Sequence, residues 1–380
     1  MNILVGADIV PTPSNIQNFE KSSVECLVDD SLNNILISAD YRIFNLETPL
    51  TDSLSPINKA GPVLSASTKS VKGIKSLGAN FLTLANNHIL DQGVQGLTNT
   101  ITTLKKNKIN FAGAGDCLND ASKPYIFILK GLRIGIYCCA EHEFSIASSN
   151  GPGANPFDPL ESLDQISLLK SHCDFVLVLY HGGKELYRFP SPYLQKTCRK
   201  IIDKGADVVI CQHSHCIGCK EKWGNGTIVY GQGNFLFDDG DNEWYSTSLL
   251  VNITLNKNNF EVSYIPLEKS GSSVILATEN YEKILNAFYY RSSLIKDERF
   301  VISQYDDLSA QEFQKYLTLI QGNLFRSVIF RVFNKLSLHK LLPFLLKKRY
   351  SVSNICELVN ILECEVHREC FLNGLKNKLN

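Results

Sequence analysis

Residues 210–219, "ICQHSHCIGC", place five side chains that can bind a metal ion within a short stretch: Cys211, His213, His215, Cys216 and Cys219. A structural zinc site needs four ligands, and Cys216 and Cys219 have the spacing of one ligand pair. His213 and His215 are too close together to be the usual second pair. On an extended strand both imidazoles would point to the same side, as two ligands on one face of a larger cleft.

Similar polar residues follow other apolar segments. The runs 2–10, 41–47, 81–87, 175–183 and 207–213 are rich in Val, Ile and Leu, which is typical of strands in a covered sheet. Ligands of α/β proteins bind outside the carboxyl ends of strands. A single polar residue there could be a hydrogen-bonded cap, but five such strand ends favour one shared cleft. The residues are Asp8, Asn45, Glu47, Asn86, Asn87, His88, His181, His213 and His215.

Carboxylate, amide and imidazole ligands together suit a divalent ion such as Mn, Fe or Zn. The sequence therefore predicts a metal cleft whose ligands come from distant strands. A structural zinc site at 210–219 is the alternative, with Cys211 assigned to the core of its strand in either case.

The segments between the strands predict the architecture. Helical spacing occurs at 67–78, 96–108 and 191–205, and a hairpin is expected over 124–140 around Lys130 and Gly131. Alternating strands and helices indicate an α/β domain. The run 226–237 reads as one further strand.

The last third of the chain changes character. Residues 246–268 read as two antiparallel strands, and from Glu279 the pattern is helical, with one helix expected over 355–370. The Gly- and Pro-rich stretch 148–159 predicts a long loop.

Composition narrows the class of protein. The 380 residues contain 38 basic and 38 acidic side chains, so no global charge favours nucleic acid. Most of the 12 cysteines lie in apolar runs, which favours reduced thiols. The sequence shows neither a signal-peptide pattern nor an apolar run of spanning length. These features predict a cytoplasmic protein.

The motifs "NLETPLT", "LANNHILDQG", "YHGGKE", "GADVVICQHSH" and "YGQGNFLFD" appear in order within residues 2–240. As a set they resemble the CapA-type poly-γ-glutamate capsule biosynthesis family, an offshoot of the calcineurin-like metallophosphoesterases. The resemblance implies a four-layer αββα sandwich followed by an α-helical region, with domains expected at 1–270 and 271–380. It also implies a metal-dependent hydrolase or transferase of capsule or surface polysaccharide biosynthesis. Metal-activated water would attack a phosphoester or amide centre.

The resemblance also implies roles for single residues. Asp8 and His215 would bind a first metal, Asn87, His181 and His213 a second, and Glu47 both. His88 would act as acid to the leaving group or as a hydrogen-bond donor. The remaining motif positions would contact substrate or assist catalysis: Asn45, Asn86, Asp91, Glu185 and Asn234.

One position departs from the phosphoesterase pattern, because Val10 stands where a histidine ligand is expected. One or two ions of Mn, Fe or Zn are therefore the expected cofactors. Two other functions stay open, namely a non-catalytic accessory protein of a polymer synthesis or export complex, and a general phosphomonoesterase.

Residues 321–350 carry basic side chains and no acidic one, interleaved with apolar residues at helical spacing. Such a helix can lie on an anionic membrane surface, or it can pack on the core with its basic side exposed. The expected partners are accordingly a small-molecule or polymer-precursor substrate, a polymer synthesis complex and the inner face of a membrane, and not nucleic acid.

Overall fold

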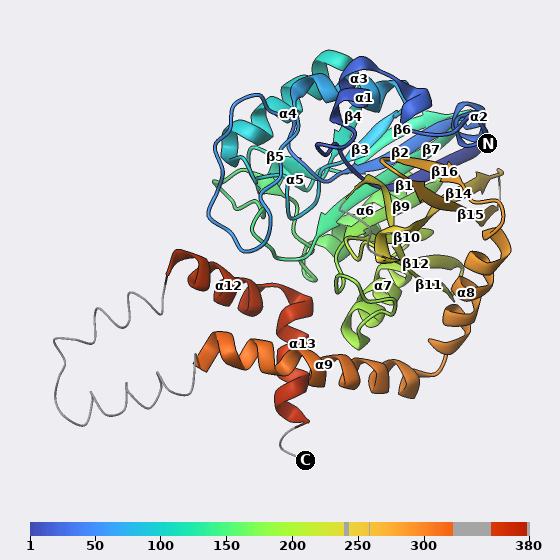
Figure 1. Ribbon diagram of the computed structural model, residues 1–380. Helices are drawn as coiled ribbons and strands as arrows, with labels where there is room; N and C mark the ends of the chain where they lie inside the picture. Colours follow the sequence, from blue (N-terminus) through green and yellow to red (C-terminus); the bar gives the residue numbers. More distant parts are fainter. Residues whose placement is uncertain (239–242, 258, 322–350, 378–380) are drawn as a thin grey trace, which may run out of the picture.

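The computed structural model describes residues 1–238, 243–257, 259–321 and 351–377 (Figure 1). Two sheets lie face to face, and helices cover the outer side of each (Figure 1). The expected four-layer αββα sandwich is therefore confirmed, and so are helices in the C-terminal region. The basic segment expected to meet a membrane lies outside the described residues from position 322 onward.

The first sheet contains β1 (Asn2–Val10), β2 (Tyr41–Leu46), β3 (Phe81–Thr83), β4 (Asn110–Ala112), β13 (Asn234–Phe237), β14 (Thr247–Leu255), β15 (Phe260–Ser270) and β16 (Ser273–Leu276). Its strand order is β16-β15-β14-β1-β2-β3-β4. Strand β1 has a third neighbour, since its first half pairs with β14 and its last residues pair with β13. This register places Asn45 and Asn234 on either side of Asp8.

The second sheet has the order β11-β12-β10-β9-β7-β6. Its strands are β6 (Tyr125–Leu129), β7 (Leu132–Ala140), β9 (Phe175–His181), β10 (Val208–Gln212), β11 (Ile217–Trp223) and β12 (Gly226–Gln232). The expected hairpin joins β6 to β7, with positive φ at both Lys130 and Gly131. Within the predicted loop 148–159, β8 (Gly153–Ala154) pairs with β5 (Ala114–Gly115) in a two-stranded ladder.

Alternate residues of a strand reach different cores. In β1, Ile3 and Val5 pack between the sheets, whereas Leu4 faces the helices on the outer side. Those outer helices are α1 (Ile16–Lys21), α2 (Asp30–Ser38), α3 (Val71–Ser76) and α4 (Gly93–Asn107). On the second sheet the cover is α6 (Ser162–His172) and α7 (Pro192–Asp203). Burial on both faces explains the continuous apolar strands of the sequence.

Two glutamines join the sheets through hydrogen bonds. Gln212 Nε2 donates to the Gly6 carbonyl at 3.3 Å, and Gln232 Nε2 donates to the Val5 carbonyl at 2.8 Å. Both side chains are buried at the ends of strands in the second sheet. They help to fix the two carboxyl edges relative to each other.

The single strand predicted over 226–237 is wrong. The chain leaves β12 in the second sheet, turns at Gly233 with φ +78° and enters the first sheet as β13. A Cβ at Gly233 would lie 2.7 Å from the Thr247 carbonyl oxygen, so no larger residue fits this crossing. The strand predicted over 81–87 also ends early, at Thr83.

Four helices follow the sandwich: α8 (Tyr281–Leu294), α9 (Glu298–Gln321), α12 (Val352–Glu363) and α13 (Glu365–Lys376). Figure 1 shows α13 crossing α9, and Tyr305, Tyr316 and Cys370 form the buried contact between them. The single helix predicted over 355–370 is wrong, because Cys364 is extended and separates α12 from α13. The domain division near residue 270 stays a prediction. No helix among the described residues is long and apolar enough to cross a membrane.

Replacing Ile210 in β10 by alanine should destabilise the inter-sheet core. Ile210 is completely buried there, and truncation of such a side chain costs about 2–5 kcal/mol. Ile37→Ala is the matched control, since Ile37 is 69% exposed. The denaturation midpoint should fall for Ile210→Ala and stay near wild type for Ile37→Ala; equal midpoints would contradict the assigned packing.

Candidate metal centre

The strand-end residues lie together at the carboxyl edges of both sheets. Asp8 and Asn45 are near the ends of β1 and β2, Glu47 directly follows β2, and His181 ends β9. The loop after β3 contributes Asn86, Asn87 and His88, and the loop after β10 contributes His213 and His215. Asn234 is the first residue of β13. All ten are at least nine-tenths buried.

Two groups of potential metal ligands share one carboxylate. Glu47 groups with His181 and His213, and it groups again with Asp8 and His215. Within each group the ligand atoms lie within 4.8 Å of one another. This geometry can hold two ions that share Glu47. The ligand sets implied by the resemblance, which add Asn87 to the second group, stay a prediction.

The carboxylates of this site have oxygens with no hydrogen-bond partner among the described residues. They are Asp8 Oδ2 and both oxygens of Glu47, although His181 Nε2 lies 3.2 Å from Glu47 Oε1. Burial, followed by the Asp8 charge, raises the pKa of Glu47 well above its usual range. Buried carboxylate oxygens without donors are costly, and divalent cations would satisfy them. The residues present therefore fit a metal centre.

The histidines divide by their surroundings. Burial lowers the pKa of His181 to about 4 and that of His213 to about 3, which leaves both rings neutral and able to bind a metal. Burial also acts against protonation of His215, but the Glu47 and Asp8 carboxylates outweigh it and raise its pKa to about 10. A proton on His215 therefore offsets negative charge that a cation would otherwise neutralise.

Two asparagines orient the Asp8 carboxylate and the residues around it. Asn45 Nδ2 donates to Asp8 Oδ1 at 2.8 Å and lies 3.3 Å from His181 Nδ1. Asn86 Nδ2 in turn donates to Asn45 Oδ1 and to the Leu46 carbonyl. Asn45 and Asn86 thus hold neighbouring side chains of the centre through hydrogen bonds, and their contact with substrate stays a prediction.

Asn87 connects the second group of ligands to Glu143. Its Oδ1 lies 3.1 Å from His181 Nε2, and its Nδ2 donates to Glu143 Oε2 at 2.6 Å. The hydrogen bond to Glu143 turns the amide oxygen toward the metal ligands. This orientation suits the predicted amide ligand.

The backbone at the histidine pair differs from the extended geometry expected for it. Strand β10 ends at Gln212, and His213 and His215 have φ of 89° and 54°. Non-glycine residues in this region are strained by about 1–3 kcal/mol and cluster at functional sites. The two rings still reach the same centre, and a tight turn rather than strand alternation brings them there.

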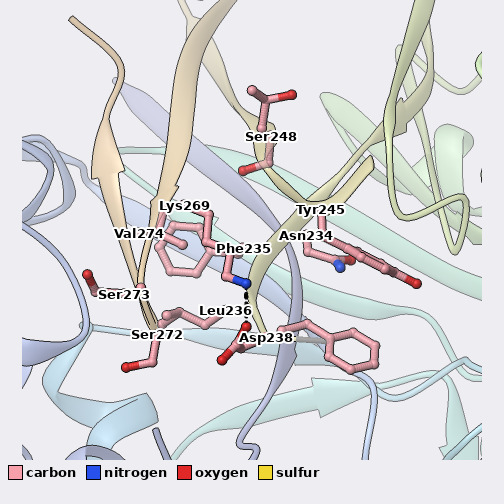
Figure 2. A pocket seen from close by; sticks show the side chains of 13 residues that line it. Asn234, Phe235, Leu236, Asp238, Tyr245, Ser248, Lys269, Ser272, Ser273 and Val274 are labelled. Carbon is pink, nitrogen blue, oxygen red and sulfur yellow. Dashed lines mark ion pairs between the residues drawn. The ribbon is translucent and has the colours of Figure 1, made fainter. Parts of the chain in front are cut away.

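Figure 2 shows the neighbourhood of Asn234 on β13, with Tyr245 beside it and the Lys269–Asp238 ion pair further along the strand. Asn234 Oδ1 lies 2.9 Å from His215 Nδ1, and Phe237 and Tyr245 place their rings against the His215 imidazole. Asn234 therefore orients a predicted metal ligand.

His88 and Asp91 form a buried pair with a third member that the sequence analysis missed. His88 Nδ1 and Asp91 Oδ2 lie 2.6 Å apart, and Lys59 Nζ donates to Asp91 Oδ1 at 2.7 Å. The side chain of Lys59 is almost fully buried, although the residue lies in an irregular stretch between β2 and α3. Its position depends on how that segment folds over the loop after β3, which no local pattern reveals.

The centre opens into a cleft of about 440 Å³. His88, Glu185 and His215 line it from the sandwich, and Glu185 is half exposed with Oε1 3.9 Å from His213 Nε2. The C-terminal helices supply the opposite wall with Tyr316, Glu357, Asn360, Ile361 and His367. These residues had no metal or substrate signal in the sequence, because their spacing reports only helical packing.

The cysteines near the histidine pair do not join it. Cys211 and Cys219 belong to the core under α7, and Cys216 is fully buried. Among the described residues, no group that could hold a metal includes any of them. The fold therefore does not form a zinc site within residues 210–219. All twelve cysteines are free thiols.

The model of the family "Bacterial capsule synthesis protein PGA_cap" matches residues 3–239, which contain every residue of the two ligand groups. The chain belongs to this family. It is 32% identical to the PGA biosynthesis protein CapA of Bacillus subtilis over 245 residues, 62% of this chain and 64% of that protein. It is also 32% identical to the capsule biosynthesis protein CapA of Bacillus anthracis, over 59% of this chain and 56% of that one.

A probable polyglutamine synthesis accessory protein of Mycobacterium tuberculosis is 26% identical to this PGA_cap chain, over 53% of it and 56% of the relative. The chain thus spans less than two thirds of these relatives. Among solved structures, a phosphatase of Mycoplasma pneumoniae superposes with a TM-score of 0.44 at 14% identity, covering 70% of this chain and 93% of that one.

Replacing Glu47 by glutamine should weaken binding of both ions, because both ligand groups use this carboxylate. His213→Asn should weaken one only. Removing a residue that only hydrogen-bonds to a metal ligand already costs about 10–100-fold in metal affinity. Removing the ligand itself should therefore cost more. Elemental analysis after dialysis against limiting Mn²⁺ measures this, with the exposed Glu161→Gln as control. Equal metal content in Glu47→Gln and His213→Asn would contradict a shared ligand.

Proposed function

We propose that this PGA_cap protein is a two-metal hydrolase or transferase that acts on a phosphoester or amide bond of a capsule-polymer precursor. The observation that carries the proposal is the pair of ligand groups sharing Glu47, whose buried oxygens find no donor in the described parts of the chain. The family membership supports the polymer pathway, and the cleft supports catalysis.

The proposed metal ligands are Asp8, Glu47 and His215 at one position and Glu47, Asn87, His181 and His213 at the other. Divalent ions of Mn, Fe or Zn held there would polarise the reacting centre and activate water. Asn45, Asn86 and Asn234 hold the ligands in place through the hydrogen bonds already described.

His88 is the proposed acid for the leaving group. Asp91 fixes the ring through Nδ1, so Nε2 is the nitrogen that can deliver a proton to a substrate in the cleft. Lys59 contacts Asp91, lies 3.2 Å from His88 Nδ1 and donates to the Asn87 carbonyl. It is therefore a positioning residue for this pair. Glu185, at the mouth of the cleft, is proposed to contact substrate.

A second function has its own support. Val10, where a histidine ligand is expected from the metallophosphoesterase pattern, is a buried core residue paired with Phe237. Within the described part of the chain the first position therefore has three protein ligands. A non-catalytic accessory protein of a polymer synthesis complex could keep such a cleft for binding. A cytoplasmic location at the inner face of the membrane belongs to this proposal too.

His88→Asn should lower kcat by about 10²–10⁴-fold, because general acid catalysis contributes that much, while metal content stays at the wild-type level. The exposed His172→Asn is the matched control and should keep full activity. Steady-state kinetics with elemental analysis of each variant measure both quantities. A variant that loses metal together with activity would contradict the assigned acid role.

The substrate class is tested with Mn²⁺-loaded protein on p-nitrophenyl phosphate, bis-p-nitrophenyl phosphate and γ-glutamyl oligopeptides. The proposal expects turnover of the diester or the γ-glutamyl substrate that exceeds turnover of the monoester. Efficient turnover of the monoester would favour a general phosphomonoesterase instead. No turnover by a fully metal-loaded protein would favour the accessory function.

A further inference from the structure

A separate cluster of metal-competent side chains lies where the sandwich meets the C-terminal helices. It consists of Glu143, Cys364 and His367, and their ligand atoms all lie within 4.8 Å of one another. Glu143 follows β7, Cys364 separates α12 from α13, and His367 lies in the first turn of α13. We propose that these three side chains, with a water molecule from the cleft as fourth ligand, form a zinc site that fixes α13 to the wall of the cleft.

The ligand types and distances fit zinc. A thiolate, an imidazole and a carboxylate are the ligands that Zn²⁺ binds, and tetrahedral bonds of about 2.0–2.3 Å separate neighbouring ligand atoms by about 3.3–3.8 Å. Glu143 Oε1 and His367 Nε2 are 3.7 Å apart, which is too far for a hydrogen bond and right for two ligands of one ion. A zinc ion therefore needs little rearrangement of these two side chains.

Each ligand is also oriented by a neighbour. His367 Nδ1 lies 2.9 Å from the Tyr316 hydroxyl, and metal-binding histidines hold their second ring nitrogen in such a hydrogen bond. Glu143 Oε2 accepts from Asn87 Nδ2, so Oε1 is the oxygen facing His367. The Cys364 sulfur lies 3.8 Å from Glu141 Oε2.

Charge favours a cation at this point. Glu141 is 5% exposed, Glu143 is 9% exposed and the Cys364 side chain is fully buried. Buried carboxylates are costly unless a positive charge accompanies them. A divalent ion between Glu143 and Cys364 would offset the negative charge of the Glu143 carboxylate where the sandwich meets the C-terminal helices.

The zinc site would share no ligand with the centre around Glu47, yet the two are joined by a single residue. Glu143 binds Asn87, and Asn87 Oδ1 lies 3.1 Å from His181 Nε2. Zinc held by α13 would therefore fix the Glu143 carboxylate that orients a proposed ligand of the other centre. The inference does not depend on the proposed reaction.

Cobalt substitution tests the site, because none of the ligands assigned to the centre around Glu47 is a sulfur. The full chain, stripped with a chelator and reconstituted with Co²⁺, should show a sulfur-to-cobalt charge-transfer band in the near ultraviolet. The band should persist in His213→Asn and vanish in Cys364→Ser. Cys356→Ser is the control, since Cys356 lies on α12 and its thiol donates to the Asn58 carbonyl instead.

Zinc content gives a second readout that does not require loss of the thiol. Native mass spectrometry of zinc-loaded protein should show about one ion fewer per chain in His367→Gln than in wild type. No band in wild type, a band that survives Cys364→Ser, or unchanged zinc content in His367→Gln would overturn the proposal. If Cys364→Ser fails to fold by circular dichroism, the His367→Gln comparison decides. His213→Asn reports on the other centre separately.

Discussion

The structure depends on a concentration of negative charge at the meeting point of the two sheets. Asp8 and Glu47 are fully buried there, and three of their four oxygens accept no hydrogen bond from any residue that the structure describes. Such carboxylates are tolerated only beside positive charge. The protonated His215 provides some of that charge, and the ligand geometry leaves the remainder to metal ions. The asparagines around the pair then serve to hold these oxygens in one arrangement.

The sheets are built so that this charge is held rigidly. Strand β1 receives β14 along its first half and β13 along its last residues, which places polar residues from three strands side by side. The crossing at Gly233 makes this possible, since it transfers the chain from one sheet to the other beside Asp8. Gln212 and Gln232 then join the sheets through buried hydrogen bonds. Packing of this kind can hold the strained turn at His213 and His215.

The sandwich and the C-terminal helices meet at the cleft rather than merely lying beside each other. Tyr316, Asn360 and His367 form part of the wall that faces His88 and His215. The helices thereby narrow access to the proposed catalytic residues. The C-terminal helices lie outside the residues that the family model matches, and this contact connects them directly to the site.

Much of the architecture could be predicted from the sequence, since strands buried on both faces appear as continuous apolar runs and polar residues mark their ends. Those ends identified the whole set from Asp8 to His215 that the fold brings together. Local patterns failed where a conformation depends on a distant contact. The turn at Gly233, the break at Cys364 and the positive φ at His213 are all of this kind.

By itself the sequence determined which side chains gather at the carboxyl edges, because β-strand direction fixes where each strand end must lie. Its alternation of strands and helices also indicated an α/β domain, whereas the four-layer order was implied by the family resemblance. Only the tertiary structure decided that Glu47 is shared by two ligand groups, that Lys59 supports Asp91, and that Glu143, Cys364 and His367 converge. Some of these groups join residues that lie more than two hundred positions apart in the sequence. The distances between their side chains arise from packing that no local spacing encodes.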